Sequence, residues 1–300
     1  MDSFRLPRFK REPSVAPPQL TERDREIIRH VYRHRFLRSS HICSLVAGSQ
    51  QQILRRLKLL YHHGYLARPR AQIDYYHQGG SREIVYGLGN KSASILKPEL
   101  GEMFRQTPWD EENGSVKGIF LQHALLVSDI MVALALACRE SGVCLLTEQD
   151  LATANRPFRW NMNVAGQKLS AVPDRVFALE FQGADSNPRR SYFFLEADRG
   201  TMPVIRKSLV QTSFYRKLLA YEATWTHGIH EKQFGFHRFR VLTVTTSPLR
   251  VKSLIDACFT LKSGHGLFLF TDRSVLDNPQ KILSHIWQTG RPGETGTLLD

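Results

Sequence analysis

Three acidic residues in two short apolar segments are the strongest candidates for chemistry in this 300-residue chain. Asp174 follows a proline at the start of one segment, and Glu196 and Asp198 lie two positions apart at the end of the other. Because side chains alternate along a strand, Glu196 and Asp198 are expected on the same face. If Asp174 lies on the neighbouring strand, the three carboxylates converge. Such a cluster suits one or two Mg²⁺ ions that activate water against a phosphodiester.

The alternative for these acids is a cluster without metal. Two carboxylates about 4 Å apart repel each other by roughly 4 kcal/mol at an effective dielectric of 20. Without a metal, the cluster therefore needs a neighbouring cation or a raised pKa. Arg175, Arg199 and Arg206 are near in sequence and are candidates for that cation.

The segments around the acids alternate between strand and helix patterns. Apolar, strand-like runs occupy residues 143–147, 172–181, 191–198, 240–245 and 266–271. Helical periodicity occupies residues 121–140, 203–224, 249–261 and 277–288. This mixture predicts an α/β domain with a central sheet over residues 118–300. The apolar run at 119–138 is long enough to span a bilayer, but its polar residues favour a buried helix.

The first third of the chain holds most of the net charge. Residues 1–98 carry 18 Lys and Arg against 7 Asp and Glu, whereas the remaining residues carry 23 against 21. A net charge of +11 out of +13 therefore lies in the first segment. A concentrated basic charge on a small helical module is typical of proteins that bind duplex DNA.

The same segment carries the signals of a winged helix-turn-helix. Thr21 and Asp24 have capping-box spacing before a first helix, and a short second helix follows residues 39–40. Ser49 caps a third helix that ends at Gly64, and strands expected at 71–76 and 82–88 flank a Gly-Gly turn. Helix, short helix, helix and a two-stranded wing are the elements of that motif.

We therefore expect four parts in the chain. They are a basic, Pro-rich arm at residues 1–20, a winged helix at 21–98, an acidic linker at 99–117 and the α/β domain at 118–300. The arm is expected to stay mobile until it meets a partner.

Polar side chains on the third helix are the candidates for reading DNA. We expect Arg55 or Arg56 to pair with guanine and Gln51 or Gln52 with adenine. The full predicted set is Ser49, Gln51, Gln52, Arg55, Arg56 and Lys58 on the helix, with Arg68, Arg70 and Arg82 on the wing. About six phosphate contacts would weaken binding roughly 10³-fold between 50 and 200 mM salt. The alternatives are a solvated helix face or a protein-binding module, and the charge favours DNA.

The order of these elements resembles that of known proteins. The order helix, strand, Pro-Asp strand, Glu-x-Asp strand, helix, strand resembles the restriction-endonuclease-like fold of the PD-(D/E)xK superfamily. Roughly residues 20–258 resemble the replication-relaxation family of bacterial plasmids and integrative elements. The matching segments are Leu-Thr-Glu-Arg-Asp at 20–24, the helix at 123–129, Pro-Asp at 173–174 and Phe-Leu-Glu-Ala-Asp-Arg-Gly-Thr at 194–201. The resemblance implies a DNA-binding accessory role in plasmid replication, relaxation or mobilisation.

One departure from that superfamily affects the expected activity. Its nucleases place a lysine two residues after the second acid, where this chain has Asp198. Lys207 or Lys217, on the following expected helix, are possible substitutes. We expect an inactive domain that docks replication or relaxase proteins. The alternative is a Mg²⁺-dependent endonuclease with Asp174, Glu196 and Asp198 as ligands and Lys207 as the catalytic lysine.

The remaining expectations concern location and assembly. Four scattered cysteines without a Cys-x-x-Cys pair, and no signal segment, favour a cytoplasmic protein that is not held in a membrane. The winged helix predicts a possible homodimer on paired half-sites. A third functional class is a transcriptional repressor whose large domain serves for dimerisation.

Overall fold

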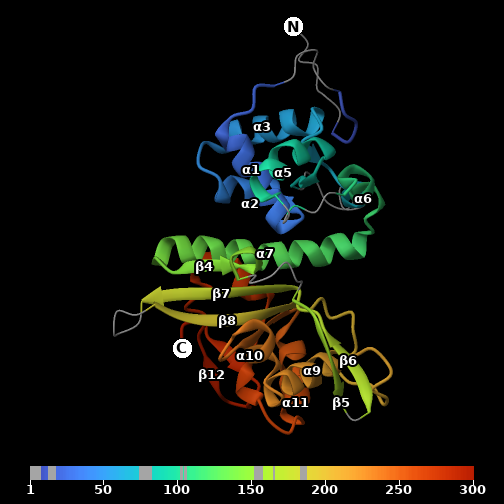
Figure 1. Cartoon of the computed structure of the whole chain (residues 1–300), viewed down its shortest axis with the longest axis vertical. Coiled ribbons are helices and arrows are strands. Elements are labelled where there is room, and N and C mark those ends of the chain that lie inside the picture. The colour runs from blue at the N-terminus through green and yellow to red at the C-terminus, as the bar shows by residue number, and fades with distance from the viewer. Residues whose placement is uncertain are drawn as a thin grey trace. The chain divides into compact units, whose positions relative to one another are not determined.

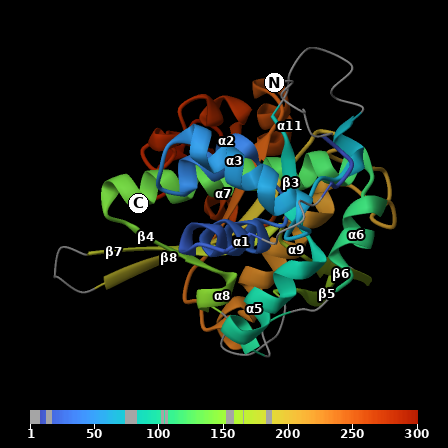
Figure 2. The same ribbon diagram turned by 90° about the horizontal axis from the view of Figure 1, so that it is seen from above.

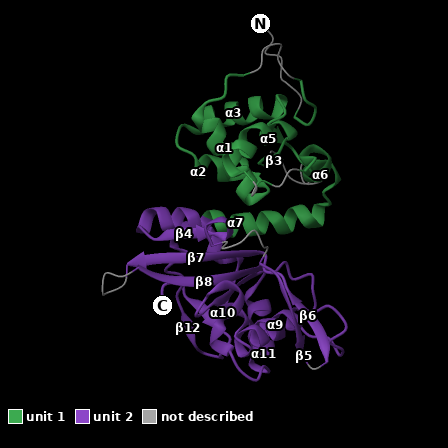
Figure 3. Cartoon of the chain, viewed as in Figure 1, with its two compact units in different colours: residues 1–132 green, residues 133–300 purple. Residues whose placement is uncertain are grey.

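The computed structural model describes residues 8–12, 18–73, 83–101, 104, 107–151, 158–164, 166–182 and 188–300. The chain is a mixed α/β protein, as the sequence predicts. It has two compact units, residues 1–132 and residues 133–300, and the division falls within one long helix (Figure 3).

The first unit consists of short helices around a small sheet, and it ends in the long helix. Its main elements are α1 (Glu22–His34), β1 (Leu37–Arg38), α2 (Ser39–Leu45), α3 (Gln50–His62), β2 (Leu66–Ala67), β3 (Val85–Leu88), α5 (Ala93–Leu100), α6 (Trp109–Ser115) and α7 (Gly118–Ser141). Helices α2 and α3 lie side by side (Figures 1 and 2). Strand β3 pairs antiparallel with β1 on one side and with β2 on the other.

Local capping explains where α1 and α3 begin. The Asp24 main-chain N–H donates to the Thr21 hydroxyl, and the Thr21 main-chain N–H donates to Asp24 Oδ2 at 2.7 Å. This is the predicted capping box, and it satisfies two of the N–H groups that a helix start leaves unpaired. Ser49 caps α3 by accepting from the Gln52 N–H at 3.3 Å. Both helix starts are therefore confirmed.

The predicted strand at 71–76 is wrong in its described part. Residues Arg70–Gln72 form a 3-10 turn instead, and residues 74–82, which include Arg82, lie outside the described residues. The buried Gln72 amide explains the difference. Its Oε1 accepts from the Val85 N–H at 2.8 Å, and its Nε2 donates to the Val85 carbonyl at 3.0 Å. A side chain thus satisfies the backbone of Val85 where a strand was expected.

The segment predicted as a linker, residues 99–117, contains α6, and α6 packs into the first unit. Trp109 is buried, with its ring centroid 6.3 Å from that of Tyr32. The Asn113 side-chain amide donates to the Leu88 carbonyl at 2.6 Å. The acidic composition that suggested a linker instead provides ion-pair partners, because Asp110 and Glu112 contact arginines of the same unit.

Helix α7 is long and apolar enough to cross a membrane by length and composition alone. Its most apolar window is 56% buried inside the protein. In the first unit, Leu121 and Leu125 pack against Phe36 and Val85, and the Ser128 hydroxyl donates to the Phe36 carbonyl at 2.7 Å. Such burial accounts for the apolar composition in the way the sequence predicts.

The second unit is built on a seven-stranded sheet of order β12-β11-β10-β9-β8-β7-β4, with a separate β5-β6 hairpin. Its strands are β4 (Cys144–Thr147), β5 (Trp160–Val164), β6 (Gln167–Ala171), β7 (Arg175–Gln182), β8 (Pro188–Ala197), β9 (Arg240–Thr245), β10 (Phe268–Asp272), β11 (Trp287–Thr289) and β12 (Thr295–Gly296). Its helices after α7 are α8 (Glu148–Leu151), α9 (Phe214–Thr226), α10 (Ile229–Phe234) and α11 (Pro248–Phe259). Strands β8, β9 and β10 are parallel, and the other neighbouring pairs are antiparallel.

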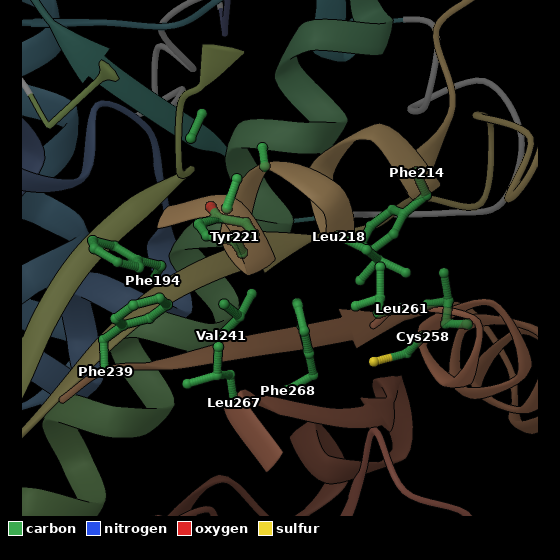
Figure 4. Packing of buried hydrophobic residues seen from close by; sticks show 14 of the residues in the cluster. Phe194, Phe214, Leu218, Tyr221, Phe239, Val241, Cys258, Leu261, Leu267 and Phe268 are labelled. Carbon is green, nitrogen blue, oxygen red and sulfur yellow. The ribbon is translucent and has the colours of Figure 1, made fainter. Parts of the chain in front are cut away.

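The main core of this unit lies between the sheet and helices α9 and α11. These helices connect β8 to β9 and β9 to β10, and crossovers of one hand between consecutive parallel strands put both helices on one face. Phe194 packs against the rings of Tyr221 and Phe239, at centroid distances of 5.7 and 5.0 Å (Figure 4). This packing fixes α9 over the end of β8 that carries the acidic residues.

Two predicted helices in this unit differ from the structure. The helix expected at 203–224 begins only at Phe214, where Ser213 precedes it. The last helix, expected at 277–288, is absent from this described segment. Residues Arg273–Asp277 and Pro279–Lys281 form 3-10 turns, and β11 follows. Pro279 stands at the start of the second turn, where proline is tolerated because a first-turn N–H has no helical partner, and the chain returns to the sheet at β11.

Candidate acid–lysine site and nucleic-acid interface

The antiparallel pairing of β7 with β8 brings the predicted acids together. Arg175 opposes Leu195, so the start of β7 lies beside the end of β8. Asp174 precedes β7, and its Oδ2 accepts from the Ala197 N–H at 2.8 Å. Glu196 is the second-last residue of β8, and Asp198 is the first residue after that strand. The three acids therefore lie together where β7 begins and β8 ends, but their side chains have different partners.

Glu196 is buried, at 1% exposure, and both of its carboxylate oxygens have donors. Oε2 forms an ion pair with the Lys217 ammonium, and Oε1 accepts from the Tyr221 hydroxyl at 2.5 Å. Lys217 and Tyr221 are four residues apart on α9, so both project from the same face of the helix. One helix face thus satisfies the buried acid.

Burial and the neighbouring charges shift the pKa values of Glu196, Lys217 and Tyr221. Burial raises the pKa of Glu196, and the positive charge of Lys217 opposes that rise. Burial disfavours the charged form of Lys217, but the negative charge of Glu196, followed by that of Asp174, raises its pKa above the usual value. Burial and the Glu196 charge also hold the pKa of Tyr221 well above its usual value. A protonated tyrosine and a charged lysine therefore both donate to one carboxylate.

Asp198 has a separate set of partners around its carboxylate. Oδ2 accepts from Arg250 Nε at 2.8 Å and from the Thr245 hydroxyl at 2.6 Å, and Oδ1 accepts from the Gly200 N–H at 3.0 Å. Arg250 also donates to the Met202 carbonyl at 2.6 Å. Asp198 thus ties the loop after β8 to the first turn of α11.

The predicted magnesium ligands do not fit a metal in this arrangement. Among the described residues, no group of three His, Cys, Asp or Glu side chains could hold a metal ion. Glu196 is occupied by Lys217 and Tyr221, and Asp198 is occupied by Arg250 and Thr245. The cluster is neutralised by cations, which is the alternative that the sequence left open.

The cations at this site are not the ones that the sequence singled out first. Lys207 is exposed in the irregular segment before α9, whereas Lys217, the other lysine considered, contacts Glu196. Arg175 donates to the main-chain carbonyl of Asp174, at 3.0 Å. The site residues predicted from the sequence include neither Tyr221 nor Arg250. The four-residue spacing of Lys217 and Tyr221 was a usable signal, but nothing in the sequence indicated Arg250.

The first unit offers a different kind of surface on α3. Ile53, Leu57 and Leu60 are buried, and the predicted DNA-reading side chains that are exposed are Ser49, Gln51, Gln52, Arg55 and Lys58. Residues 27–73 contain nine Lys and Arg and no Asp or Glu. The outward face of α3 therefore carries amides and cations on a segment without acidic residues.

Two predicted DNA contacts are instead bound within the protein. Arg56 forms a two-pronged ion pair with the fully buried Asp24, with Nε 2.8 Å from Oδ1. Arg68 stacks over the Tyr61 ring at 4.0 Å and donates to the Tyr86 hydroxyl at 3.2 Å. Of the other predicted wing cations, Arg70 is exposed, and Arg82 lies outside the described residues.

Comparison with known proteins identifies the family. The model of the replication-relaxation family matches residues 28–238, which is more than half of the chain. The chain belongs to the replication-relaxation family. No curated protein and no solved structure matches it significantly.

The replication-relaxation match covers most of the features described above. It includes α3, the three acids, Lys217 and Tyr221, and it ends before Arg250. The family therefore links this chain to replication and relaxation.

Proposed function

We propose that this protein binds duplex DNA through the outward face of α3, as an accessory protein in the replication, relaxation or mobilisation of a plasmid or related mobile element. The observation that carries the proposal is the acid-free segment 27–73, which exposes Gln51, Gln52, Arg55 and Lys58 from one helix. A helix presenting these side chains suits the major groove, where amides and guanidinium groups read base edges.

The surrounding elements support this use of α3. Three helices followed by antiparallel strands have the order of a winged helix, in which the third helix enters the groove. Because Arg56 is held by Asp24, Arg55 is the guanine-reading candidate of the two. Gln51 and Gln52 are the candidates for adenine, and Lys58, closer to the C-terminal end of the helix, is the candidate for a phosphate.

The proposal is tested by substituting exposed cations of α3. Arg55→Ala and Lys58→Ala should each weaken duplex binding and lower the slope of log affinity against log salt by about one. Arg55→Ala should also relax base preference at one position, because a bidentate arginine contact discriminates by about 1–3 kcal/mol. Fluorescence anisotropy with a randomised duplex library measures both effects.

A matched control is Arg33→Ala, which removes an exposed arginine from α1. Its duplex affinity should fall only slightly, by the amount expected from the loss of one positive charge away from α3. Equal affinities for the wild type, Arg55→Ala and Lys58→Ala at every salt concentration would rule out α3 as the DNA-binding face.

For the second unit, we propose that the acid–lysine site is structural and that this unit docks replication or relaxase partners. All three acids are used within the fold, and Asp198 replaces the usual lysine of the related nucleases. One observation favours a second candidate, an endonuclease, because Lys217 brings an ammonium group to Glu196, with Asp174 nearby. Among the described residues, the acids as arranged do not form a metal-binding set.

Plasmid cleavage with Mg²⁺ or Mn²⁺ separates the two candidates. A structural site predicts intact supercoiled plasmid with the wild type, while DNA binding persists in Asp174→Ala. Nicking that disappears in Asp174→Ala and Lys217→Met, but not in the exposed control Lys207→Met, would make the protein an endonuclease. Agarose gels under matched protein concentrations provide the readout.

A further inference from the structure

Residues 8–12 of the N-terminal arm are described, and they contact the end of α3 where the sequence predicts a mobile segment. Arg11 Nε donates to the Tyr61 carbonyl at 3.1 Å, and Nη2 donates to the Leu66 carbonyl at 2.9 Å. The same guanidinium forms an ion pair with Asp110 of α6 at 2.6 Å. Arg11 therefore joins the arm to α3, β2 and α6 together.

The backbone of the arm is held on both sides of Lys10. The Glu12 main-chain N–H donates to His62 Nδ1 at 3.0 Å, and Arg68 Nη1 donates to the Arg8 carbonyl at 2.5 Å. Residues 8–12 are thus fixed by backbone contacts at each end and by Arg11 between them. Lys10 is exposed within this fixed stretch.

The arm is attached in line with the DNA-reading face. Gln51, Arg55, Lys58 and His62 follow one another at intervals of four, three and four residues, so they form one row along α3. Because Glu12 binds to His62, the arm joins the C-terminal end of this row. Arg55 and His62 are about 10 Å apart along the helix axis, at 1.5 Å per residue.

We propose that the docked arm is a second DNA-contacting element, which presents Lys10 to phosphates next to the bases read by α3. This inference rests on the proposed function of α3. Arg11 acts as a positioning residue: it contacts protein, not DNA, and it orders the arm before DNA arrives. A segment that is already ordered avoids the conformational entropy cost that a mobile arm meets on binding.

Duplex affinity and hydrogen exchange test this proposal with three arm variants. Lys10→Ala should lower the salt slope by about one, which is a roughly three- to fourfold change in the ratio of affinities at 50 and 200 mM salt. Arg11→Ala should weaken affinity and also speed exchange of the Glu12 amide, because the arm is released. Glu12→Gln keeps the main-chain bond to His62 and removes a negative charge beside the C-terminal end of the row, so affinity should rise.

The control is Lys97→Ala, an exposed lysine of α5 that lies outside this row. If Arg55→Ala weakens binding while Lys10→Ala and Arg11→Ala behave like Lys97→Ala, the arm proposal is overturned and the role of α3 stands. If Arg55→Ala also has no effect, both proposals are overturned. Lys10 is exposed, so its substitution leaves the fold intact and gives a readout even if Arg11→Ala destabilises the unit.

Discussion

Two neighbouring arginines of α3 have opposite surroundings at the scale of single residues. Arg55 is exposed, whereas Arg56 holds Asp24, whose exposure is 0%. Burial alone would raise the pKa of Asp24, but hydrogen bonds from Arg56 and Thr21 more than compensate and lower it. One arginine is therefore available to a partner, and the other stabilises the joint between α1 and α3.

The first prediction at this scale compares Arg56→Met with Arg55→Met. Removing Arg56 leaves a buried carboxylate without its cation, so the free energy of unfolding should fall by about 3 kcal/mol. Arg55→Met, on the surface, should change it by less than about 0.5 kcal/mol. Urea unfolding followed by circular dichroism measures both values.

The pH dependence of the same pair gives an independent check. Because the folded pKa of Asp24 is lowered, the pair adds stability above the ordinary aspartate pKa of about 3.9, and that stability is lost as the pH falls through the folded value. Arg56→Met should therefore lose less stability than the wild type on acidification. A wild type and a variant with parallel stability curves between pH 2 and 5 would contradict this account.

At the scale of elements, the first half of helix α7 packs into the first unit, so a boundary at residue 118 would divide one core. Leu121 and Leu125 cover Phe36 and Val85. Asp129 binds Arg38 Nη1 at 3.1 Å and His41 Nε2 at 3.0 Å. The first half of α7 therefore completes the core of the first unit, although its sequence pattern groups it with the segment that follows.

We predict that fragment 1–132 is markedly more stable than fragment 1–117. Burying two leucine side chains contributes about 3 to 6 kcal/mol, and the shorter fragment also leaves Arg38 without its carboxylate. Thermal melts followed by circular dichroism should show a cooperative transition for fragment 1–132 only. Equal melting temperatures for the two fragments would mean that α7 is dispensable to the first unit.

At the scale of the whole molecule, the two units carry nearly equal net charges. Residues 1–132 contain 20 basic and 13 acidic residues, and residues 133–300 contain 21 and 15, so the net charges are +7 and +6. The strong asymmetry of the first 98 residues is offset by the acidic residues that follow. Glu99, Glu112 and Asp129 form ion pairs with arginines of the first unit. The feature that favours DNA binding is therefore the local face of α3, not the net charge of the unit.

The sequence by itself predicted features that depend on neighbours in the chain. Thr21 and Ser49 start their helices through bonds to residues three positions away, and apolar runs predicted β7, β8 and β9. Alternation is also present in β5, where Trp160 and Met162 are buried. Local hydrogen bonds and periodicity depend on residues that are close together in the chain, so these features can be predicted without a structure.

Only the tertiary structure decided which cation each functional group meets. Lys217 binds Glu196 across 21 residues, Arg250 binds Asp198 across 52, and Arg11 binds Asp110 across 99. Those choices follow from how α9, α11 and the arm pack, because a long side chain reaches whichever partner the packed backbone places within a few ångströms. The sequence therefore located the acids and the helix proposed to contact DNA, and folding assigned their partners.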